Sequence, residues 1–140
     1  MSRLLFLLAA LLISLSPCPA RIIRVADTGD GTNGQTWATA FRTVNAALVN
    51  AASGDQIWVK EGRYHEAIRR KDGVSLLGGF AGVETDEQFE ARNPAQYLTI
   101  LDATGSMVST VSAEHVSSVV LEGWTIMGGG GGFRRRSCPG

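Results

Sequence analysis

Two acidic residues at matching positions are the first candidates in this sequence for catalysis or cation binding. Asp102 follows Leu101 and Glu122 follows Leu121, each at the end of a short apolar run. If the two leucines stack in neighbouring strands, the carboxylates lie about 5 Å apart, which suits a retaining glycosidase and also a Ca²⁺ ion. Trp124 is the nearby aromatic residue for a sugar to stack on. Acidic residues are also common where strands end, and we interpret the pair as turn residues.

A glycine-rich segment, Asp27–Gly34, holds further oxygen ligands. Asp27, Asp30 and Asn33 carry the side-chain type that binds Ca²⁺. An EF-hand loop starting at Asp27 needs Glu at its twelfth position, where this chain has Ala38. The Gly-Lys-Ser/Thr ending of a phosphate-binding loop is also missing. We therefore interpret the segment as turns and expect no cofactor, with Ca²⁺ as the alternative.

The remaining reactive side chains form no recognisable set. His65 and His115 are fifty residues apart, and neither has a second His or Cys at metal-ligand spacing. No Gly-x-Ser-x-Gly segment marks a nucleophile, and the basic run Arg69–Lys71 is typical of a solvated turn. We therefore predict no catalytic residues and expect that this chain by itself is not an enzyme.

The composition is that of an ordinary folded domain. The chain has 140 residues, of which 44% are apolar and 19% are charged, which excludes a disordered charged tail. Thirteen basic residues balance thirteen acidic ones, so the charge predicts no nucleic-acid partner. The 17 glycines predict many turns.

The first twenty residues have the features of a secretory signal peptide. Arg3 precedes the uncharged run Leu4–Leu15, and Ser16–Ala20 supplies a small-residue cleavage site. A helix over that run is about 18 Å long, too short for a hydrocarbon core of about 30 Å, so we expect no membrane span after cleavage. The protein is then secreted or held in the cell envelope, with a lipoprotein anchored at Cys18 as the alternative. Cys138 is the one cysteine left after cleavage, which excludes an intrachain disulfide.

Short strands and one helix must position these residues. Apolar residues at helical spacing, from Phe41 to Ala51, predict an amphipathic helix over Ala38–Ala52. A capping box, Thr85-x-x-Gln88, predicts a short surface helix over Thr85–Ala91, inside a loop at 82–94. Apolar runs bounded by polar residues or glycine predict strands at Ile22–Val25, Gln56–Val59, Val74–Leu77, Leu98–Leu101 and Val119–Leu121.

Three of these strands share a leucine in the same place. Leu77, Leu101 and Leu121 end similar apolar runs that are 24 and 20 residues apart. Because no Asn-Gly hairpin turn separates the runs, we predict parallel strands in successive coils, about 4.8 Å apart, with the leucines aligned. An ordinary β-sandwich is the alternative.

Several segments together resemble the N-terminal part of secreted bacterial right-handed parallel β-helix proteins, the pectin-lyase-like superfamily. The resemblance implies an all-β fold, a right-handed parallel β-helix of about three coils with an N-terminal capping α-helix, truncated at its C-terminal end. The expected division is 1–20 signal peptide, 21–55 strand, turn and capping helix, 56–129 coils, and 130–140 a disordered Gly/Arg tail. The segments are Gly34–Phe41, Ala47-Leu48, Ala51–Val59, Glu61–Tyr64, Gly78–Glu84, Arg92 and Leu121–Ile126.

The resemblance narrows the function to classes only, because the superfamily includes polysaccharide lyases, glycoside hydrolases and adhesins. We expect an exported scaffold fragment of surface-adhesin or carbohydrate-binding type, whose partner is a polysaccharide or cell-surface glycan. The alternative is the N-terminal part of a polysaccharide lyase or glycoside hydrolase whose catalytic coils are absent. A missing distal cap would leave strand edges exposed and predicts end-to-end self-association.

Overall fold

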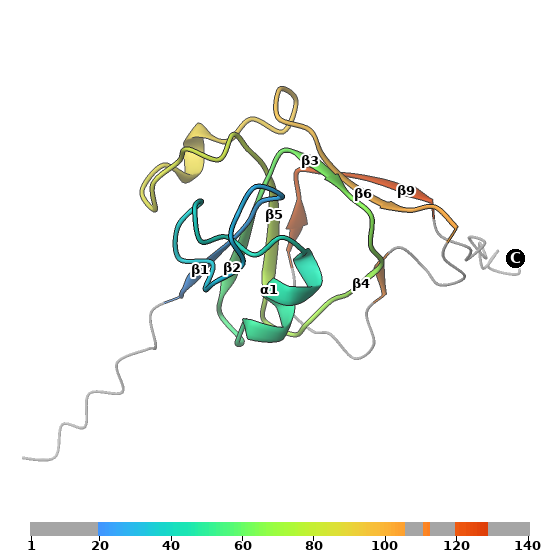
Figure 1. Cartoon of the computed structure of the whole chain (residues 1–140), viewed down its shortest axis with the longest axis horizontal. Helices are drawn as coiled ribbons and strands as arrows, with labels where there is room; N and C mark the ends of the chain where they lie inside the picture. The colour runs from blue at the N-terminus through green and yellow to red at the C-terminus, as the bar shows by residue number, and fades with distance from the viewer. Residues whose placement is uncertain (1–19, 106–110, 113–119, 129–140) are drawn as a thin grey trace, which may run out of the picture.

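The computed structural model of the chain describes residues 20–105, 111–112 and 120–128 (Figure 1). Residues 1–19 of the predicted signal peptide lie outside the described residues, as do His115, Cys138 and the tail at 130–140. Within the described part, no helix is long and apolar enough to cross a membrane.

The structure is a mixed α/β fold, so the predicted all-β class, a right-handed parallel β-helix of about three coils, is wrong. Short parallel strands form sheets in the orders β1-β2-β5-β8, β3-β6-β9 and β4-β7, and one α-helix packs against them (Figure 1). The elements are β1 Ile22–Val25, α1 Val44–Asn50, β2 Gln56–Lys60, β3 Gly62–Tyr64, β4 Ile68–Arg69, β5 Ser75–Phe80, the 3₁₀ helix η1 Phe89–Ala91, β6 Thr99–Ala103, β7 Val111–Ser112, β8 Leu121–Glu122 and β9 Trp124–Gly128.

The predicted alignment of leucines is also wrong. Leu77 pairs with Glu122, and it is Leu76 that pairs with Leu121. Leu101 lies in a different sheet, where it pairs with Tyr64 on β3 and with Ile126 on β9. For Leu77 the reason is that two adjacent leucines occupy β5, so the apolar pattern cannot distinguish registers that differ by one residue, although that shift exchanges the two faces of a strand. For Leu101 the reason is that β6 belongs to another sheet.

The core explains why α1 is shorter than the predicted helix over Ala38–Ala52. Phe41 is extended, bridges Val25 in parallel and exchanges hydrogen bonds with Arg24 and Ala26 of the β1 segment. The helix therefore starts only after Thr43, whose hydroxyl accepts the amide of Ala46 at 3.1 Å as an N-cap. Its apolar stripe is buried as predicted and consists of Val44, Ala47 and Leu48. The stripe packs with the inward side chains of β1, β2, β4 and β5, namely Ile23, Val25, Ile57, Val59, Ile68 and Leu76.

Charged side chains of the segment around β4 complement both ends of α1. The Glu66 carboxylate accepts the amides of Val44 at 2.6 Å and Asn45 at 3.0 Å, at the helix N-terminus. The Lys71 ammonium donates to the carbonyls of Leu48, at 3.3 Å, and Ala51, at the C-terminal end. Both contacts satisfy terminal backbone groups and oppose the helix dipole. Lys71 is exposed, as expected for a solvated segment, but its ammonium also binds the helix end, which the sequence did not predict.

We expect Lys71→Met to lower the free energy of unfolding by about 1 kcal/mol, because the last carbonyls of α1 lose their cation. Urea unfolding followed by tryptophan fluorescence measures the effect. Arg69→Met is the control, since Arg69 is exposed on β4 and makes no such contact with the helix. Equal stability of the Lys71 variant and the wild type would show that the contact contributes nothing.

Candidate functional site

The candidate site lies on the outer face of the β1-β2-β5 sheet, on the side away from the main core. Trp58 of β2 stacks on Phe80 of β5, with ring centroids 4.6 Å apart. Trp37 and Phe89 pack at the edges of this pair, each with a centroid 5.9 Å from one of its rings. These two outer aromatic residues come from loops, so the cluster fastens the Gln35–Trp37 loop and the 82–94 loop to the sheet.

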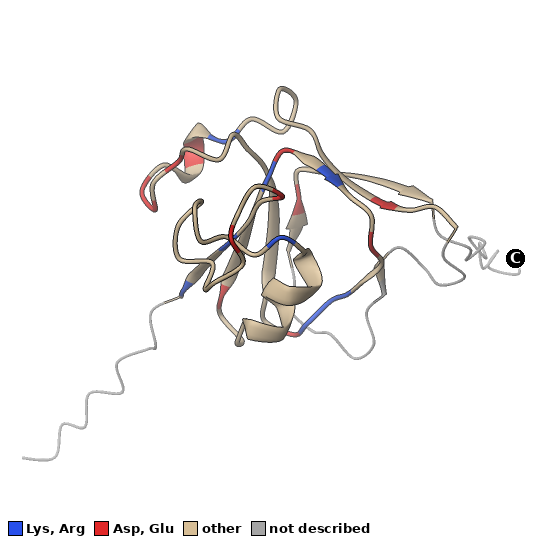
Figure 2. Ribbon diagram, viewed as in Figure 1, with Lys and Arg blue, Asp and Glu red and all other residues tan. Residues whose placement is uncertain are grey.

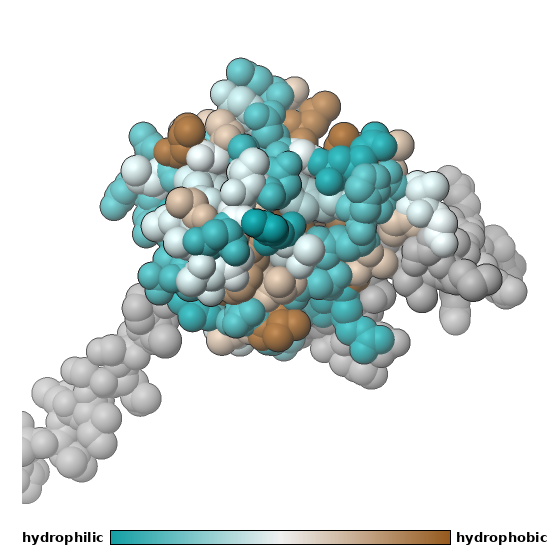
Figure 3. Space-filling model, viewed as in Figure 1, coloured by the Kyte–Doolittle hydropathy of each residue, from teal (hydrophilic) through white to brown (hydrophobic). Residues whose placement is uncertain are grey.

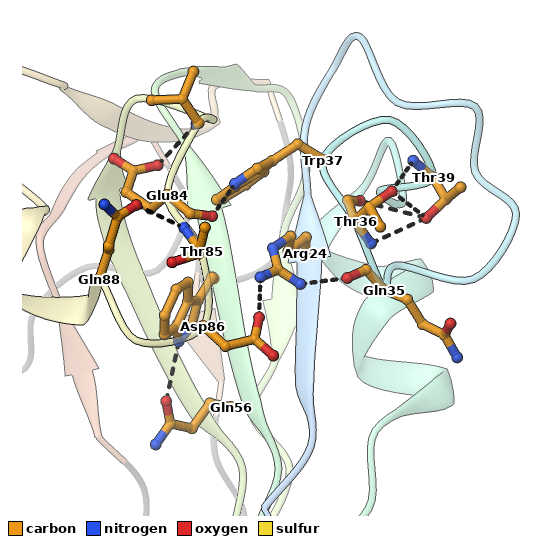
Figure 4. A network of polar contacts seen from close by, with 12 residues as sticks. Arg24, Gln35, Thr36, Trp37, Thr39, Gln56, Glu84, Thr85, Asp86 and Gln88 are labelled. Atoms are coloured by element: carbon orange, nitrogen blue, oxygen red, sulfur yellow. Dashed lines mark hydrogen bonds and ion pairs between the residues drawn. The ribbon is translucent and has the colours of Figure 1, made fainter.

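Arg24 is a buried cation between these two loops (Figure 4). Its side chain is only 6% exposed, and its guanidinium carbon lies 5.5 Å from the ring centre of Trp37 and 5.7 Å from that of Trp58. The guanidinium donates to the carbonyl of Gln35 on one loop and to the carboxylate of Asp86 on the other. Arg24 therefore links the two loops through one charged group.

An open groove of about 450 Å³ runs between the loops. A second hollow of about 350 Å³ continues it, because Arg24, Gln35 and Asp86 line both. Hydrophilic side chains dominate the face of the molecule seen in Figure 3, with hydrophobic ones in separate patches. The main groove is lined by Arg24, Gln35, Thr36, Trp37, Val83, Glu84, Thr85, Asp86 and Glu87.

Glu84 holds the groove wall formed by the 82–94 loop. Its buried carboxylate accepts the amides of Ala81 at 2.7 Å, Gly82 at 2.9 Å and Val83 at 3.0 Å, while its carbonyl accepts the Trp37 indole N–H at 2.8 Å. Burial acts to raise the pKa of Glu84, but the backbone N–H donors outweigh it and the pKa is lowered. The loop is thus shaped by an ionised carboxylate, and it forms only one 3₁₀ turn at Phe89–Ala91 where a longer helix was predicted.

The lowered pKa of Glu84 predicts that the protein loses stability in acid. The unfolded carboxyl binds its proton near its ordinary pKa of about 4.3, whereas the folded one resists protonation until lower pH. The unfolded state therefore binds more protons in this range, so the stabilisation is complete above the ordinary pKa and is lost as the pH falls through the folded one. Asp55 acts in the same direction, since its pKa is lowered, against burial, by the amides of Ala52 and Arg21 and by the Arg21 side chain.

Unfolding measured in urea at about pH 7 and about pH 3.5 checks this expectation. Glu84→Gln should lose about 1–3 kcal/mol at neutral pH, because the buried amides lose their anionic acceptor, and should show a smaller further loss in acid. Glu87→Gln, at an exposed position on the same loop, should behave like the wild type. If Glu84→Gln lost as much stability in acid as the wild type does, Glu84 would not be a source of the acid dependence.

The structure separates the two carboxylates that the sequence pointed to first. Asp102 pairs with Met127 in the β3-β6-β9 sheet, whereas Glu122 lies in the other large sheet and binds Arg92 at 2.6 Å. The predicted stacking of Asp102 on Glu122 is therefore wrong, because β6 and β8 belong to different sheets and are not neighbours. Trp124, the expected sugar platform, packs partly buried against the core.

Asp102 instead lies close to the side chains of Arg63 and His65. The Thr104 hydroxyl and amide bind one of its oxygens, while the other lies 3.4 Å from Arg63 Nη1 and 3.7 Å from His65 Nδ1. The hydrogen bonds from Thr104 are the main cause of a lowered pKa of Asp102; desolvation opposes them, and Arg63 and His65 add to them. His65 is 71% exposed, so this cluster is a second, smaller candidate site.

The glycine-rich segment forms turns closed by its own polar side chains. Asp30 accepts the amide of Thr32 at 2.8 Å and also its hydroxyl, and Asn33 accepts the amide of Gln35 at 2.9 Å. Asp27 is exposed. Among the described residues, no group of three or more His, Cys, Asp or Glu side chains converges in a way that could hold a metal ion.

The groove was missed because its parts are distant in sequence: Arg24 and Asp86 are 62 residues apart. One signal for it was present, namely an arginine inside the apolar run Ile22–Val25, since a charge in a buried strand needs a partner. No protein-family model, curated protein or solved structure matches this chain. Its function must therefore be inferred from the geometry of the site.

Proposed function

We propose that this protein is an exported, non-catalytic carbohydrate-binding protein, and that a glycan lies in the groove beside Trp37. Sugars are commonly held by an aromatic ring against their C–H face and by planar polar groups on their hydroxyls. The groove offers both, because a partly exposed Trp37 is surrounded by the side chains of Gln35, Thr36, Asp86 and Glu87. Its volume lies in the usual range for small-molecule sites.

The observation that carries the proposal is the set of unused polar groups next to Trp37. In the described part of the chain, the Gln35 amide and the Glu87 carboxylate have no hydrogen-bond partner. Asp86 is 64% exposed, and only one of its oxygens faces Arg24. An amide and carboxylates can each bind two adjacent sugar hydroxyls.

The groove is also held in shape before a ligand arrives. Arg24 joins its two walls, and the Trp37 indole N–H is fixed to the Glu84 carbonyl. Trp37 therefore presents its ring rather than its N–H to the ligand. Such preorganisation supports binding, because less conformational freedom is lost when the ligand is bound.

A screen of neutral oligosaccharides, followed by titration calorimetry on the ones that bind, tests the proposal. We expect Trp37→Ala to weaken binding about 30-fold, the typical effect of removing an aromatic anchor, and Trp37→Phe to retain part of the affinity. Tyr97→Ala is the matched control, since Tyr97 is a partly exposed aromatic residue outside the groove. Absence of any oligosaccharide binding, or full affinity in Trp37→Ala, would overturn the proposal.

The Asp102 cluster favours one second candidate, a hydrolase or lyase that acts on polysaccharides. Asp102 lies 3.7 Å from the exposed His65 imidazole, and a carboxylate and an imidazole can act together in proton transfer. The separation is longer than a hydrogen bond, but catalytic contacts often shorten only when substrate is bound. Release of reducing or unsaturated sugar ends from polysaccharides would support it. The activity should then disappear in His65→Ala and persist in Trp37→Phe.

A further inference from the structure

We infer that the groove selects glycans that carry a free amine, such as glucosamine polymers, over their neutral or acidic counterparts. The inference rests on the proposed function and adds the charge of the ligand to it. It starts from the charged groups that line the groove, namely one cation, Arg24, and three carboxylates, those of Glu84, Asp86 and Glu87.

Two of these four charged groups, Arg24 and Glu84, already bind partners within the protein. The Arg24 guanidinium is buried between Trp37 and Trp58 and already binds Asp86 and the Gln35 carbonyl. The Glu84 carboxylate faces the amides of its own loop. A ligand in the groove therefore meets neither the cation nor this carboxylate as a free partner.

The charge that faces the ligand is negative. Glu87 is exposed, and Asp86 is also largely exposed, with only one oxygen bound to Arg24. Acidic residues colour the tip of the 82–94 loop red in Figure 2. An ammonium group on a sugar ring at Trp37 would gain an ion pair with Glu87. A uronate in the same place would meet like charge and lose affinity.

The experiment compares four tetrasaccharides on the full chain: β-1,4-linked glucosamine, its N-acetylated counterpart, a neutral glucose polymer and a uronate polymer. At low salt, and below the pKa of the sugar amine, we expect glucosamine to bind about two- to fivefold more tightly than the N-acetylated form, the effect of an exposed ion pair. Salt should reduce this preference. Glu87→Gln should remove most of this preference, measured as the ratio of the two affinities, because any hydroxyl contact of Glu87 is altered for both ligands alike. Glu90→Gln, the matched control on the same loop, should keep the preference.

The outcomes separate the inference from the proposed function. Equal affinities for the first two ligands, no binding of the glucosamine tetramer, or an unchanged preference in Glu87→Gln would overturn the inference. If the neutral glucose tetramer still bound in a Trp37-dependent way, the proposed function would stand. If none of the four bound, both would fall.

Discussion

Replacing Gly79 by alanine is expected to destabilise the protein by about 3 kcal/mol, the sum of backbone strain and overpacking. Gly79 lies in β5 with φ of +88°, a left-handed conformation that strains any residue with a side chain. A Cβ atom there would approach the Pro94 Cα to 2.7 Å and the Pro94 nitrogen to 2.8 Å. Because backbone atoms cannot rotate away, the end of the 82–94 loop would have to move.

That movement would reach the candidate site. Gly79 accepts the Asn93 amide at 2.8 Å and donates to the Thr99 hydroxyl at 2.9 Å, so it fixes the point where the 82–94 loop returns to the sheet. Urea unfolding gives the stability. Gly54→Ala is the matched control, because Gly54 also has a positive φ, of +94°, but a Cβ there meets no atom within 4 Å; the strain alone should cost about 1 kcal/mol. Equal losses in the two variants would show that the contact with Pro94 does not matter.

The second large effect concerns the ion pair of Arg24 and Asp86, because replacing one partner should cost more stability than replacing the other. Asp86→Asn should cost about 2 kcal/mol, because it leaves the Arg24 guanidinium buried without a counter-charge. Arg24→Met should cost about 1 kcal/mol or less, since methionine keeps the apolar contacts with Trp37 and Trp58 while the exposed Asp86 returns to water. Both variants should weaken glycan binding, because the two walls of the groove lose their link.

Unfolding of the two single variants and the double variant measures this asymmetry and the coupling between the residues. Arg21→Met is the control, since Arg21 also forms an ion pair, with Asp55 at 3.2 Å, but is half-exposed, so about 0.5 kcal/mol is expected. If Arg24→Met were the more damaging single change, the guanidinium would stabilise the fold by its own contacts, and the charge balance described here would be incorrect.

Local patterns were sufficient for part of the fold, although they missed the strands β3, β4, β7 and β9. The strand at Ile22–Val25 is confirmed with the predicted bounds, and the buried stripe of α1 follows the predicted spacing. Of the three leucine-bearing strands predicted to pair in parallel, β5 and β8 do so, whereas β6 pairs with β3 and β9 instead. Register could not be predicted, because Leu76 and Leu77 are equally apolar. The fold class could not be predicted either. The helix was expected to cap one end of an all-β fold, whereas its apolar side chains are part of the main core.

The candidate site was beyond sequence reasoning for a different reason. Trp37 and Asp86 come from loops whose shapes are set by contacts far along the chain, such as the indole N–H of Trp37 on the Glu84 carbonyl. The spacing of Asp102 and Glu122 suggested a pair, but the strands that carry them, β6 and β8, belong to different sheets. The Arg63, His65 and Asp102 cluster likewise depends on the pairing of β3 with β6.

Amide and indole NMR spectra recorded during titration with a neutral oligosaccharide that binds provide the most direct test of the glycan site. We expect the changes in chemical shift to concentrate on the Trp37 indole, the Gln35 side-chain amide and the backbone of residues 83–87, with little change at His65. Shifts centred on the β3-β6 face, or an unperturbed Trp37 indole at saturation, would contradict the assignment of the groove.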